Sequence, residues 1–383
     1  MFLIRADGNA FTGAGHLMRC LSVAQELRKL SGNGEEIHFI CADPESAALA
    51  EEHGFPAHSL GTDYQDMEAE LPRWPKLVEE LHRHGRRKEA CPREEPAALL
   101  VDSYYVTDLY LQGLGGMGYV ILMEDFGTHR YPVDCVVNYN APASLEEYQR
   151  LYGDRSVDLL IGSSYVPLRQ QFAKARGALA QEGRGGEAVC GAPAREGRGG
   201  EAARNVLVTT GGGDSENLAG KILERIYRRD MDFHLVMGRF SPHFEKMKKL
   251  EQEKANVHIH YNVENMARLM LGCDIAVTAG GSTVYELAAL GVPLLCFSYA
   301  ENQEALADCV GARGIGLSAG AWHRDPGGTL ERIGGQFQKL AADSRIRQAC
   351  SRRGMALTDG GGAERLARAL LAGREKHREQ IYG

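Results

Sequence analysis

The chain lacks the cysteine patterns that mark disulfide frameworks and zinc sites. Its 383 residues include nine cysteines, an odd number, and no two of them form a C-x-x-C pair. The sequence therefore indicates neither a disulfide-stapled fold nor a tetrahedral zinc site, and it favours a reducing compartment. We expect a cytoplasmic protein that needs no metal and no other cofactor.

Long apolar runs and an excess of positive charge are also missing. No stretch approaches the roughly 20 consecutive apolar residues of a membrane-spanning helix, and Arg5 and Asp7 interrupt the first apolar segment. Asp and Glu number 51 against 44 Lys and Arg, which gives a net charge of −7. A negative chain argues against a nucleic-acid-binding surface. We expect a monomer whose partner is a small molecule, with no membrane span.

What the sequence does contain is a regular alternation of short apolar strands and amphipathic helices. MFLIRAD and the helix-like run HLMRCLSVAQELRKL open the chain, and similar apolar segments recur to about residue 141. The alternation restarts at NVLVTTGGG with five further strand and helix pairs. Strands that are apolar on both faces are typical of parallel sheets, so the sequence predicts two doubly wound α/β domains.

Composition sets the expected domain boundaries. Residues 176–203 are dominated by Gly, Ala, Arg and Glu, and the heptapeptide EGRGGEA occurs twice there. A segment without apolar periodicity cannot offset its ordering entropy, so we expect a flexible insertion. The predicted organisation is a first domain over 1–175, this insertion, a second domain over 204–372 and a tail over 373–383. Two such domains that face each other would hold ligands in the cleft between them.

The strongest ligand-binding pattern is TAGGSTVYELAALGVP in the second domain. A strand, then Gly280 and Gly281, then Ser282 and Thr283 at a helix start would present free backbone N–H groups to a phosphate. Glu286 follows about one turn later, where its carboxylate would accept hydrogen bonds from both hydroxyls of a ribose. The alternative is an N-capped helix with a solvated glutamate.

The segment TTGGGDSEN repeats the strand, glycine turn and helix theme. It makes Gly212 a candidate for a second anion contact. The alternative is that Asp214 or Ser215 only caps the helix that starts near Asn217.

The segment FTGAGHLMRC places His16 behind a glycine turn and before a helix. Met18 replaces the third glycine of a dinucleotide fingerprint, which argues against a nicotinamide site. Gly13 and Gly15 would instead let the backbone approach a bulky ligand. A helix start disfavours imidazolium, so His16 suits the role of a neutral general base near pH 7. The alternative is a plain surface histidine.

Polar side chains follow two more predicted strands. LLVDSYY ends with Asp102, Tyr104 and Tyr105, and VVNYNA offers Asn138 and Asn140. Because ligands of α/β sheets bind at the carboxyl ends of strands, these residues are candidates for binding sugar hydroxyls or amides. Asp102 is alternatively a residue that orients His16, although the sequence sets no distance between them.

Read in order, IRADGNAFTGAGHLMRCLSVAQEL, GGGD, TAGGSTVYELAALGVP and ENQ resemble one family. They are similar to the UDP-2,4-diacetamido-2,4,6-trideoxy-β-L-altropyranose hydrolases of bacterial pseudaminic acid synthesis, a nonulosonic acid route linked to flagellin glycosylation. The resemblance covers roughly residues 1–175 and 204–372. It implies the GT-B fold shared with the UDP-GlcNAc-dependent transferase of peptidoglycan lipid synthesis. The opening motif is specific, whereas G-G-S-T-x-x-E is common to GT-B proteins.

The resemblance also implies roles for individual residues. The histidine after G-x-G acts as the base, which is His16, and the C-terminal glycine turn with its glutamate holds UDP. Tyr104 matches a position near the sugar, and Asn302 with Gln303 matches a pair that lines the nucleotide-sugar cleft. With the residues chosen above, the predicted substrate-binding set is Asp7, Gly15, Tyr104, Asn138, Gly212, Gly280, Gly281, Ser282, Thr283, Glu286, Asn302 and Gln303.

The expected reaction is hydrolysis of the UDP-sugar to UDP and 2,4-diacetamido-2,4,6-trideoxy-L-altrose. UDP is a good leaving group, so one neutral base and the amides of a helix start would suffice. A single displacement by water at the anomeric carbon inverts its configuration. Three alternatives remain open: a GT-B glycosyltransferase with a UDP-sugar donor, a hydrolase of a related UDP-diacetamido sugar, and a protein that binds the nucleotide sugar without turnover.

Overall fold

The computed structural model describes most of the chain, namely residues 1–9, 11–32, 34–85, 97–153, 156–182, 202–211, 214–239 and 241–382. Gly212 lies outside the described residues, as do residues 183–201 of the predicted insertion. The insertion was predicted to begin at residue 176, but residues 176–182 continue a helix. The predicted start was therefore too early, and Arg176 itself donates a hydrogen bond to the backbone oxygen of Met355 at 3.1 Å.

The chain divides into two compact units. Residues 1–167 and 362–383 form the first unit, and residues 168–361 form the second. The predicted boundaries assigned 362–372 to the second domain and 373–383 to a tail. In the structure one helix, α14 (Gly362–Tyr382), packs on α1 (Gly15–Leu30) of the first unit instead. Its Leu366, Ala367 and Leu370 are buried, and its Arg374 pairs with Glu35 of that unit at 2.7 Å.

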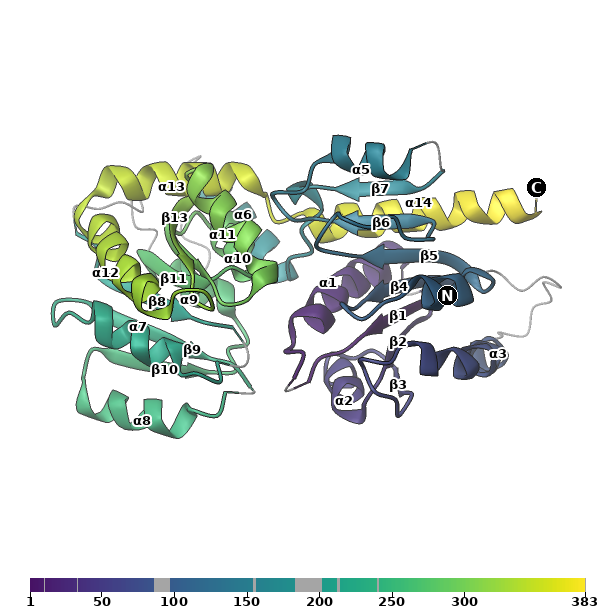
Figure 1. Ribbon diagram of the computed structural model, residues 1–383, viewed down its shortest axis with the longest axis horizontal. Helices are drawn as coiled ribbons and strands as arrows, with labels where there is room; N and C mark the ends of the chain where they lie inside the picture. The colour runs from purple at the N-terminus through teal and green to yellow at the C-terminus, as the bar shows by residue number, and fades with distance from the viewer. Residues whose placement is uncertain are drawn as a thin grey trace. The chain divides into compact units, whose positions relative to one another are not determined.

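The first unit contains a seven-stranded parallel sheet in the order β3-β2-β1-β4-β5-β6-β7 (Figure 1). Its strands are β1 (Phe2–Ala6), β2 (Ile37–Cys41), β3 (Ala57–Ser59), β4 (Ala97–Asp102), β5 (Gly118–Met123), β6 (Cys135–Asn138) and β7 (Asp158–Ile161). Every residue of β1, β4, β5 and β6 is buried, as the apolar segments predicted. The strand order reverses between β1 and β4, and ligands of such sheets bind beyond the carboxyl ends at this point.

Helices cover both faces of this sheet. Side chains of α3 (Trp74–Gly85), α4 (Asp108–Gly115) and α5 (Leu145–Tyr152) join one face in a single apolar core. On the other face α14 brings Arg374 over the ring of Phe2, at 4.8 Å from its centre. The remaining helical segments of the unit are α2 (Pro44–Glu52), η1 (Glu68–Arg73) and η2 (Ser163–Tyr165).

The second unit contains a six-stranded parallel sheet in the order β10-β9-β8-β11-β12-β13. Its strands are β8 (Asn205–Thr209), β9 (Asp232–Met237), β10 (Val257–Tyr261), β11 (Ile275–Ala279), β12 (Leu294–Ser298) and β13 (Gly316–Ala321). Its helices are α6 (Gln170–Glu182), α7 (Leu218–Ile226), α8 (Phe244–Glu253), α9 (Met266–Leu271), α10 (Thr283–Ala289), η3 (Glu301–Gln303), α11 (Glu304–Ala312), α12 (Pro326–Ala342) and α13 (Ser344–Leu357). The order reverses between β8 and β11, so the predicted doubly wound architecture is found in each unit.

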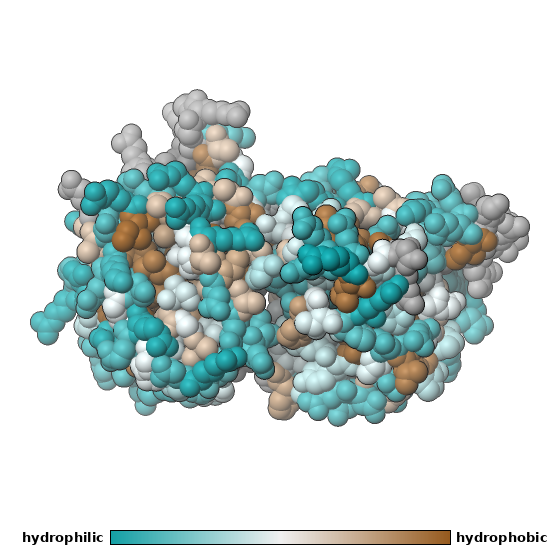
Figure 2. Space-filling view, turned by 45° about the horizontal axis from the view of Figure 1, so that its top comes forward, coloured by the Kyte–Doolittle hydropathy of each residue, from teal (hydrophilic) through white to brown (hydrophobic). Residues whose placement is uncertain are grey.

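Polar helix caps fix several of the strand-to-helix turns. Asp43 precedes Pro44 and accepts a hydrogen bond from the amide of Ser46, while Thr107 caps α4 in the same way. Such caps satisfy amides that a helix start leaves unpaired. The face of the molecule in Figure 2 is mostly hydrophilic, with separate apolar patches. Within the described ranges, no helix has the length and apolar character that a bilayer crossing requires.

Candidate functional site

The loop between β1 and α1 positions His16. The side-chain oxygen of Asn9 accepts hydrogen bonds from two loop amides at 2.9 Å, and its backbone oxygen accepts one from the amide of Gly13. Gly13 has φ +71°, a left-handed conformation that glycine adopts without a steric penalty. The chain then enters α1 at Gly15, where a Cβ would meet no atom within 4 Å. His16 therefore lies in the first turn of α1.

His16 is bonded to the carboxylate that ends β4. Its Nδ1 lies 2.6 Å from Oδ1 of Asp102, whose side chain is fully buried. Burial alone would raise the pKa of Asp102, but the charge of Arg19 and the contact with His16 hold it far below its usual range. Asp102 is therefore ionised and can only accept, so the proton of this short bond belongs to Nδ1 of His16.

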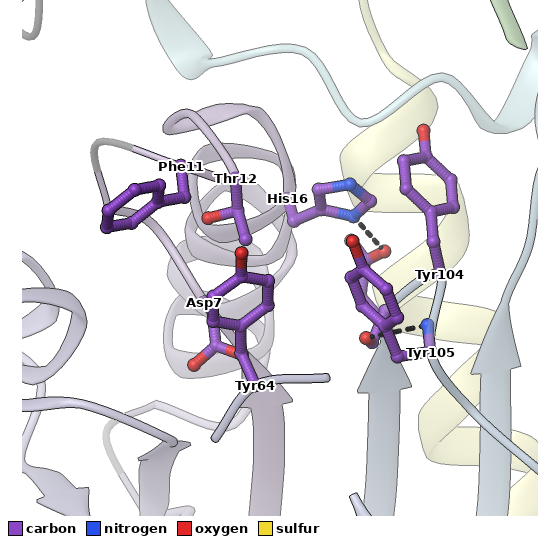
Figure 3. Close-up of a pocket in the computed structure, with 9 residues that line it drawn as sticks. Asp7, Phe11, Thr12, His16, Tyr64, Tyr104 and Tyr105 are labelled. Atoms are coloured by element: carbon purple, nitrogen blue, oxygen red, sulfur yellow. Dashed lines mark hydrogen bonds and ion pairs between the residues drawn. The ribbon is translucent and has the colours of Figure 1, made fainter. Parts of the chain in front are cut away.

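This bond fixes the tautomer of His16. With the proton on Nδ1, the neutral ring carries its lone pair on Nε2, which is the arrangement that a carboxylate imposes on a catalytic histidine. Both polar contacts of His16 with the described residues, to Asp102 and to Nη2 of Arg19 at 3.3 Å, are made by Nδ1. In this tautomer only the contact with Asp102 is a hydrogen bond, because Nη2 and Nδ1 both carry protons. In Figure 3 only one ring nitrogen of His16 carries a dashed line. Nε2 is thus available to a ligand.

Arg19 joins Asp102 to a second carboxylate, Asp125. Its Nε donates to Oδ2 of Asp102 at 2.6 Å, and its Nη1 lies 3.1 Å from Oδ1 of Asp125. Nη1 also donates to the hydroxyl of Tyr139 at 2.6 Å. Burial would raise the pKa of Asp125, but Arg19 and the Tyr104 hydroxyl lower it. Both carboxylates are consequently ionised around one guanidinium.

Tyr104 connects Asp125 to the ring of His16. Its hydroxyl donates to Oδ2 of Asp125 at 2.8 Å, and its ring meets the imidazole edge to face with centres 4.5 Å apart. This contact restrains the imidazole plane. Tyr104 was predicted to lie near the substrate, and the structure places it beside the predicted base.

A cavity of about 190 Å³ opens next to His16 (Figure 3). It is lined by Asp7, Phe11, Thr12, His16, Tyr64, Asp102, Ser103, Tyr104 and Tyr105. Pockets that enclose a whole drug-sized ligand measure roughly 300–1,000 Å³, so this cavity suits a fragment such as one sugar ring. It lies at the carboxyl ends of β1 and β4, where the strand order reverses.

Two residues of the predicted substrate-binding set hold the fold of the first unit. Asp7 lines the cavity, but its two oxygens accept hydrogen bonds from Arg5 at 2.6 Å and from a backbone amide at 2.8 Å. Asn138 is buried, donates to the hydroxyl of Tyr148 at 2.7 Å and accepts from a backbone amide at 2.9 Å. Asn138 does not line the cavity described above.

In the second unit, Gly280 and Gly281 form the turn between β11 and α10. A Cβ at Gly280 would lie 3.0 Å from the backbone oxygen of Gln303, so this close approach favours glycine. Among the residues that the structure covers, none accepts a hydrogen bond from the amide of Ser282 or Thr283. These two amides are the donors that the sequence assigned to a phosphate.

Glu286 lies one turn into α10 with its carboxylate largely buried. Its Oε1 accepts a hydrogen bond from Arg169 at 2.9 Å. The described part of the chain supplies no partner for Oε2. The expectation that both oxygens take ribose hydroxyls therefore needs amendment, because one oxygen is already engaged by an arginine.

The remaining predicted residues flank the neighbouring strands β8 and β12. Asp214 accepts hydrogen bonds from the first amides of α7, so the capping alternative holds for this residue. Gln303 accepts a hydrogen bond from the amide of Tyr299 at 2.9 Å and thereby shapes the turn after β12. Asn302 is exposed in η3. Since β8, β11 and β12 are adjacent, these turns share one edge of the sheet.

Sequence reasoning missed Arg19, Asp125 and Tyr139. Arg19 stands three residues after His16, and residues at this spacing share a helix face. Asp102 is the last residue of β4, and Asp125 lies two residues after the end of β5. Because β4 and β5 are parallel neighbours, their carboxyl ends lie side by side. These spacings indicated that Arg19 and Asp125 lie near His16 and Asp102, but they did not specify the bond between Arg19 and Asp125.

No protein-family model matches the chain. It is 24% identical to an uncharacterized protein of Methanocaldococcus jannaschii over 313 residues, which cover 80% of this chain and 57% of that protein. It is 32% identical to the spore coat polysaccharide biosynthesis protein SpsG of Bacillus subtilis over 171 residues, 44% of this chain and 50% of that one. The chain thus spans about half the length of these two relatives.

A third relative matches over nearly its whole length. The UDP-2,4-diacetamido-2,4,6-trideoxy-β-L-altropyranose hydrolase of Campylobacter jejuni is 22% identical over 315 residues, which cover 82% of this chain and 96% of that protein.

Solved structures identify the fold. MurG of Acinetobacter baumannii is similar with a TM-score of 0.61 at 13% identity, covering 97% of this chain and 99% of that one. UGT71G1 of Medicago truncatula, solved with UDP-glucose, also has a TM-score of 0.61 at 13% identity, covering 100% and 98%. The chain has the GT-B fold of these proteins, and the predicted fold class is confirmed.

Proposed function

We propose that the protein is an enzyme that acts on a UDP-sugar and hydrolyses it with His16 as the general base. The observation that carries this proposal is the short bond between Nδ1 of His16 and ionised Asp102, which leaves Nε2 as the basic nitrogen. A base held in one tautomer next to a cavity is equipped to take a proton from water.

In the proposed reaction, Nε2 of His16 removes a proton from a water molecule while the water oxygen attacks the anomeric carbon. The new C1–O bond forms as the bond from C1 to the diphosphate oxygen breaks, and UDP leaves with the electron pair. Imidazolium then returns its proton to solvent. No side chain of the cavity is assigned as a covalent nucleophile, since Asp7 and Asp102 are both held by hydrogen bonds to protein donors. We therefore propose inversion at the anomeric carbon.

In the second unit, we assign UDP to the turn between β11 and α10. The amides of Ser282 and Thr283, which have no acceptor among the described residues, are suited to phosphate oxygens, and Oε2 of Glu286 is suited to a ribose hydroxyl. Gly281, Asn302 and Gln303 are proposed to lie against the nucleotide sugar. Several structures of similar fold were solved with nucleotides, among them Neisseria meningitidis UDP-GlcNAc 2-epimerase bound to UDP-GlcNAc, with a TM-score of 0.58.

The substrate we propose is UDP-2,4-diacetamido-2,4,6-trideoxy-β-L-altropyranose, or a closely related UDP-diacetamido sugar. Support comes from the Campylobacter jejuni hydrolase, which the match covers almost completely. The phenol rings of Tyr64, Tyr104 and Tyr105 in the cavity wall are surfaces on which methyl and acetamido groups can pack. This role would place the reaction in pseudaminic acid synthesis.

Incubation of the purified protein with a panel of UDP-diacetamido sugars tests the proposal. We expect the wild-type protein to release free UDP and the free diacetamido sugar in equal amounts. His16→Asn should turn over substrate at no more than roughly 10⁻² of the wild-type rate. UDP should bind the variant as it binds wild type. Tight UDP binding without turnover of any panel member would support a nucleotide-sugar-binding protein instead.

A glycosyltransferase is the second candidate, because apolar rings stand beside the cavity. Phe11 is 85% exposed and lines the cavity, and Phe126 packs near Tyr104 with ring centres 5.8 Å apart. Exposed aromatic rings of this kind can hold the apolar face of an acceptor. Addition of candidate sugar acceptors distinguishes the two reactions, since a transferase would form a glycoside where a hydrolase releases the free sugar.

A further inference from the structure

The charges around His16 do not balance when its ring is neutral. Asp102 and Asp125 each carry one negative charge, and Arg19, whose pKa these carboxylates raise against the opposing effect of burial, carries one positive charge. The side chains of all three are at most 10% exposed. The buried cluster therefore holds one net negative charge.

The described hydroxyls, amide and thiol that hydrogen-bond to this cluster are uncharged, and the carboxyl of the buried Glu124 beside Asp125 adds no positive charge. The hydroxyls of Tyr104 and Tyr139 and the amide of Asn140 bond to Asp125 or Arg19. The thiol of Cys20 reaches Oδ2 of Asp102, and burial raises the pKa of this thiol well above its ordinary value.

Charged groups on neighbouring elements do not cancel the excess. On β1 and η1, Arg5 bonds to Asp7 and Glu70, a second buried set with one cation and two carboxylates. The start of α1 opposes a positive charge on His16. Neither the Arg5 set nor the helix start changes when Asp125 is substituted, so the effect of Asp125 is separable from theirs.

A proton on Nε2 of His16 brings the Asp102, Asp125, Arg19 and His16 group to neutrality. Unbalanced buried charge is unfavourable, so the cluster favours the protonated ring that forms when the base accepts a proton. If Asp125 were neutral, Asp102 and Arg19 would already balance, and the protonated ring would add an uncompensated positive charge.

We propose that Asp125 is a positioning residue for the base: through Arg19 and Tyr104 it sets the charge and the orientation that let His16 accept a proton. The proposal rests on the function proposed above for His16. Asp125 does not bond to His16 itself, because its hydrogen bonds go to Arg19, Tyr104 and Asn140.

The test compares Asp125→Asn with two controls in the same cluster. Asp125→Glu keeps the negative charge, and Tyr139→Phe removes a hydroxyl bonded to Arg19 without changing any charge. Two readouts are recorded: the pH dependence of kcat for UDP release, and the titration of His16 by NMR in protein with ¹⁵N-labelled histidine. The signal of His16 is assigned from its absence in His16→Asn.

The proposal expects both midpoints to move to lower pH in Asp125→Asn, by roughly one pH unit for the loss of one nearby partly buried charge. Tyr139→Phe should leave both midpoints in place, and Asp125→Glu should restore them to near wild type. If Asp125→Asn lowers kcat but leaves the pH midpoints of kcat and of the His16 NMR titration unchanged, the proposal is overturned, because Asp125 would then have only a structural role.

A second variant covers the case in which Asp125→Asn does not fold. Arg19→Gln removes the positive charge and should move the NMR midpoint to higher pH, the opposite direction, and an unmoved or lowered midpoint would overturn the proposal. Failure of the proposed function is distinguishable, because the NMR readout needs no turnover. Shifted NMR midpoints in a protein that releases no UDP would support the charge balance and contradict the hydrolase.

Discussion

Nδ1 of His16 donates a hydrogen bond to Oδ1 of the fully buried Asp102 across 2.6 Å. The two residues are 86 positions apart in the chain and come from the start of α1 and the end of β4. This hydrogen bond keeps the proton of the neutral ring on Nδ1, so His16 has a fixed tautomer with Nε2 as its basic nitrogen.

Asp102→Asn should lower kcat for UDP release by roughly 10² to 10⁴. An asparagine at this position no longer requires the proton on Nδ1, so the ring loses its preference for the tautomer with a free Nε2. Steady-state kinetics measure the effect. Asp134→Asn serves as the control, since Asp134 holds the amide of Val120 in the same unit and does not line the cavity. Equal kinetics of Asp102→Asn and wild type would remove Asp102 from the mechanism.

Glu286→Ala should weaken UDP binding by about 1–3 kcal/mol, the usual loss when a buried hydrogen-bonding group is left unsatisfied. Calorimetric titration with UDP and with its 2′-deoxyribose analogue measures this contact. The analogue should lose less affinity than UDP when Glu286 is removed. Glu301→Ala, at an exposed position of η3, should bind UDP like wild type. A variant of Glu286 with unchanged UDP affinity would contradict the ribose assignment.

Gly13→Ala should destabilise the first unit by about 1–2 kcal/mol, because an L side chain is strained at φ +71°. The turn also places His16, so kcat should fall as well. Gly15→Ala is the matched control, since a Cβ there would meet no protein atom within 4 Å. Thermal unfolding of both variants gives the comparison. Equal melting temperatures of Gly13→Ala and Gly15→Ala would contradict the prediction, because they would show that the turn accommodates an alanine at position 13 without a loss of stability.

Stability should decline as the pH falls from about 6.5, the ordinary value of histidine, to about 4. Burial, and secondarily His58, lowers the pKa of His38 to about 4. Between these values the unfolded chain binds the proton that folded His38 does not, so protonation favours unfolding. His38→Asn should show a smaller acid loss in urea titrations at pH 7 and pH 5. His129→Asn, at an exposed histidine, provides the control. If the free energy of unfolding falls equally between pH 7 and pH 5 in His38→Asn and wild type, His38 is excluded as a cause.

Much of the fold was predictable because its strands are continuous apolar runs. Segments such as FLIRA and GYVILM are buried along their whole length, and this pattern indicates parallel sheets wherever it occurs. The place of α14 was not predictable in the same way. Its Leu366, Ala367 and Leu370 are buried and its Arg374 pairs with Glu35, 339 positions away, and such long-range contacts cannot be read from the local sequence.

The site shows a similar division. A histidine behind a glycine turn indicated a helix-start base, and Asp102 was considered as its partner. The bridge of Arg19 to Asp125 depends on the register of β4 and β5 and on the rotation of α1, which local sequence does not encode. The substrate contact of Asn138 stays a prediction, and the sequence did not reveal that its side chain is hydrogen-bonded inside the fold.

Turnover of UDP-2,4-diacetamido-2,4,6-trideoxy-β-L-altropyranose in ¹⁸O-labelled water with excess chelator tests the central claim most directly. If His16 activates water against the anomeric carbon, mass spectrometry will find the label in the free sugar and not in UDP. NMR taken before mutarotation will show inverted configuration, and His16→Asn will give neither product at a comparable rate. Label in UDP, retained configuration, or a His16→Asn variant as active as wild type would contradict the account.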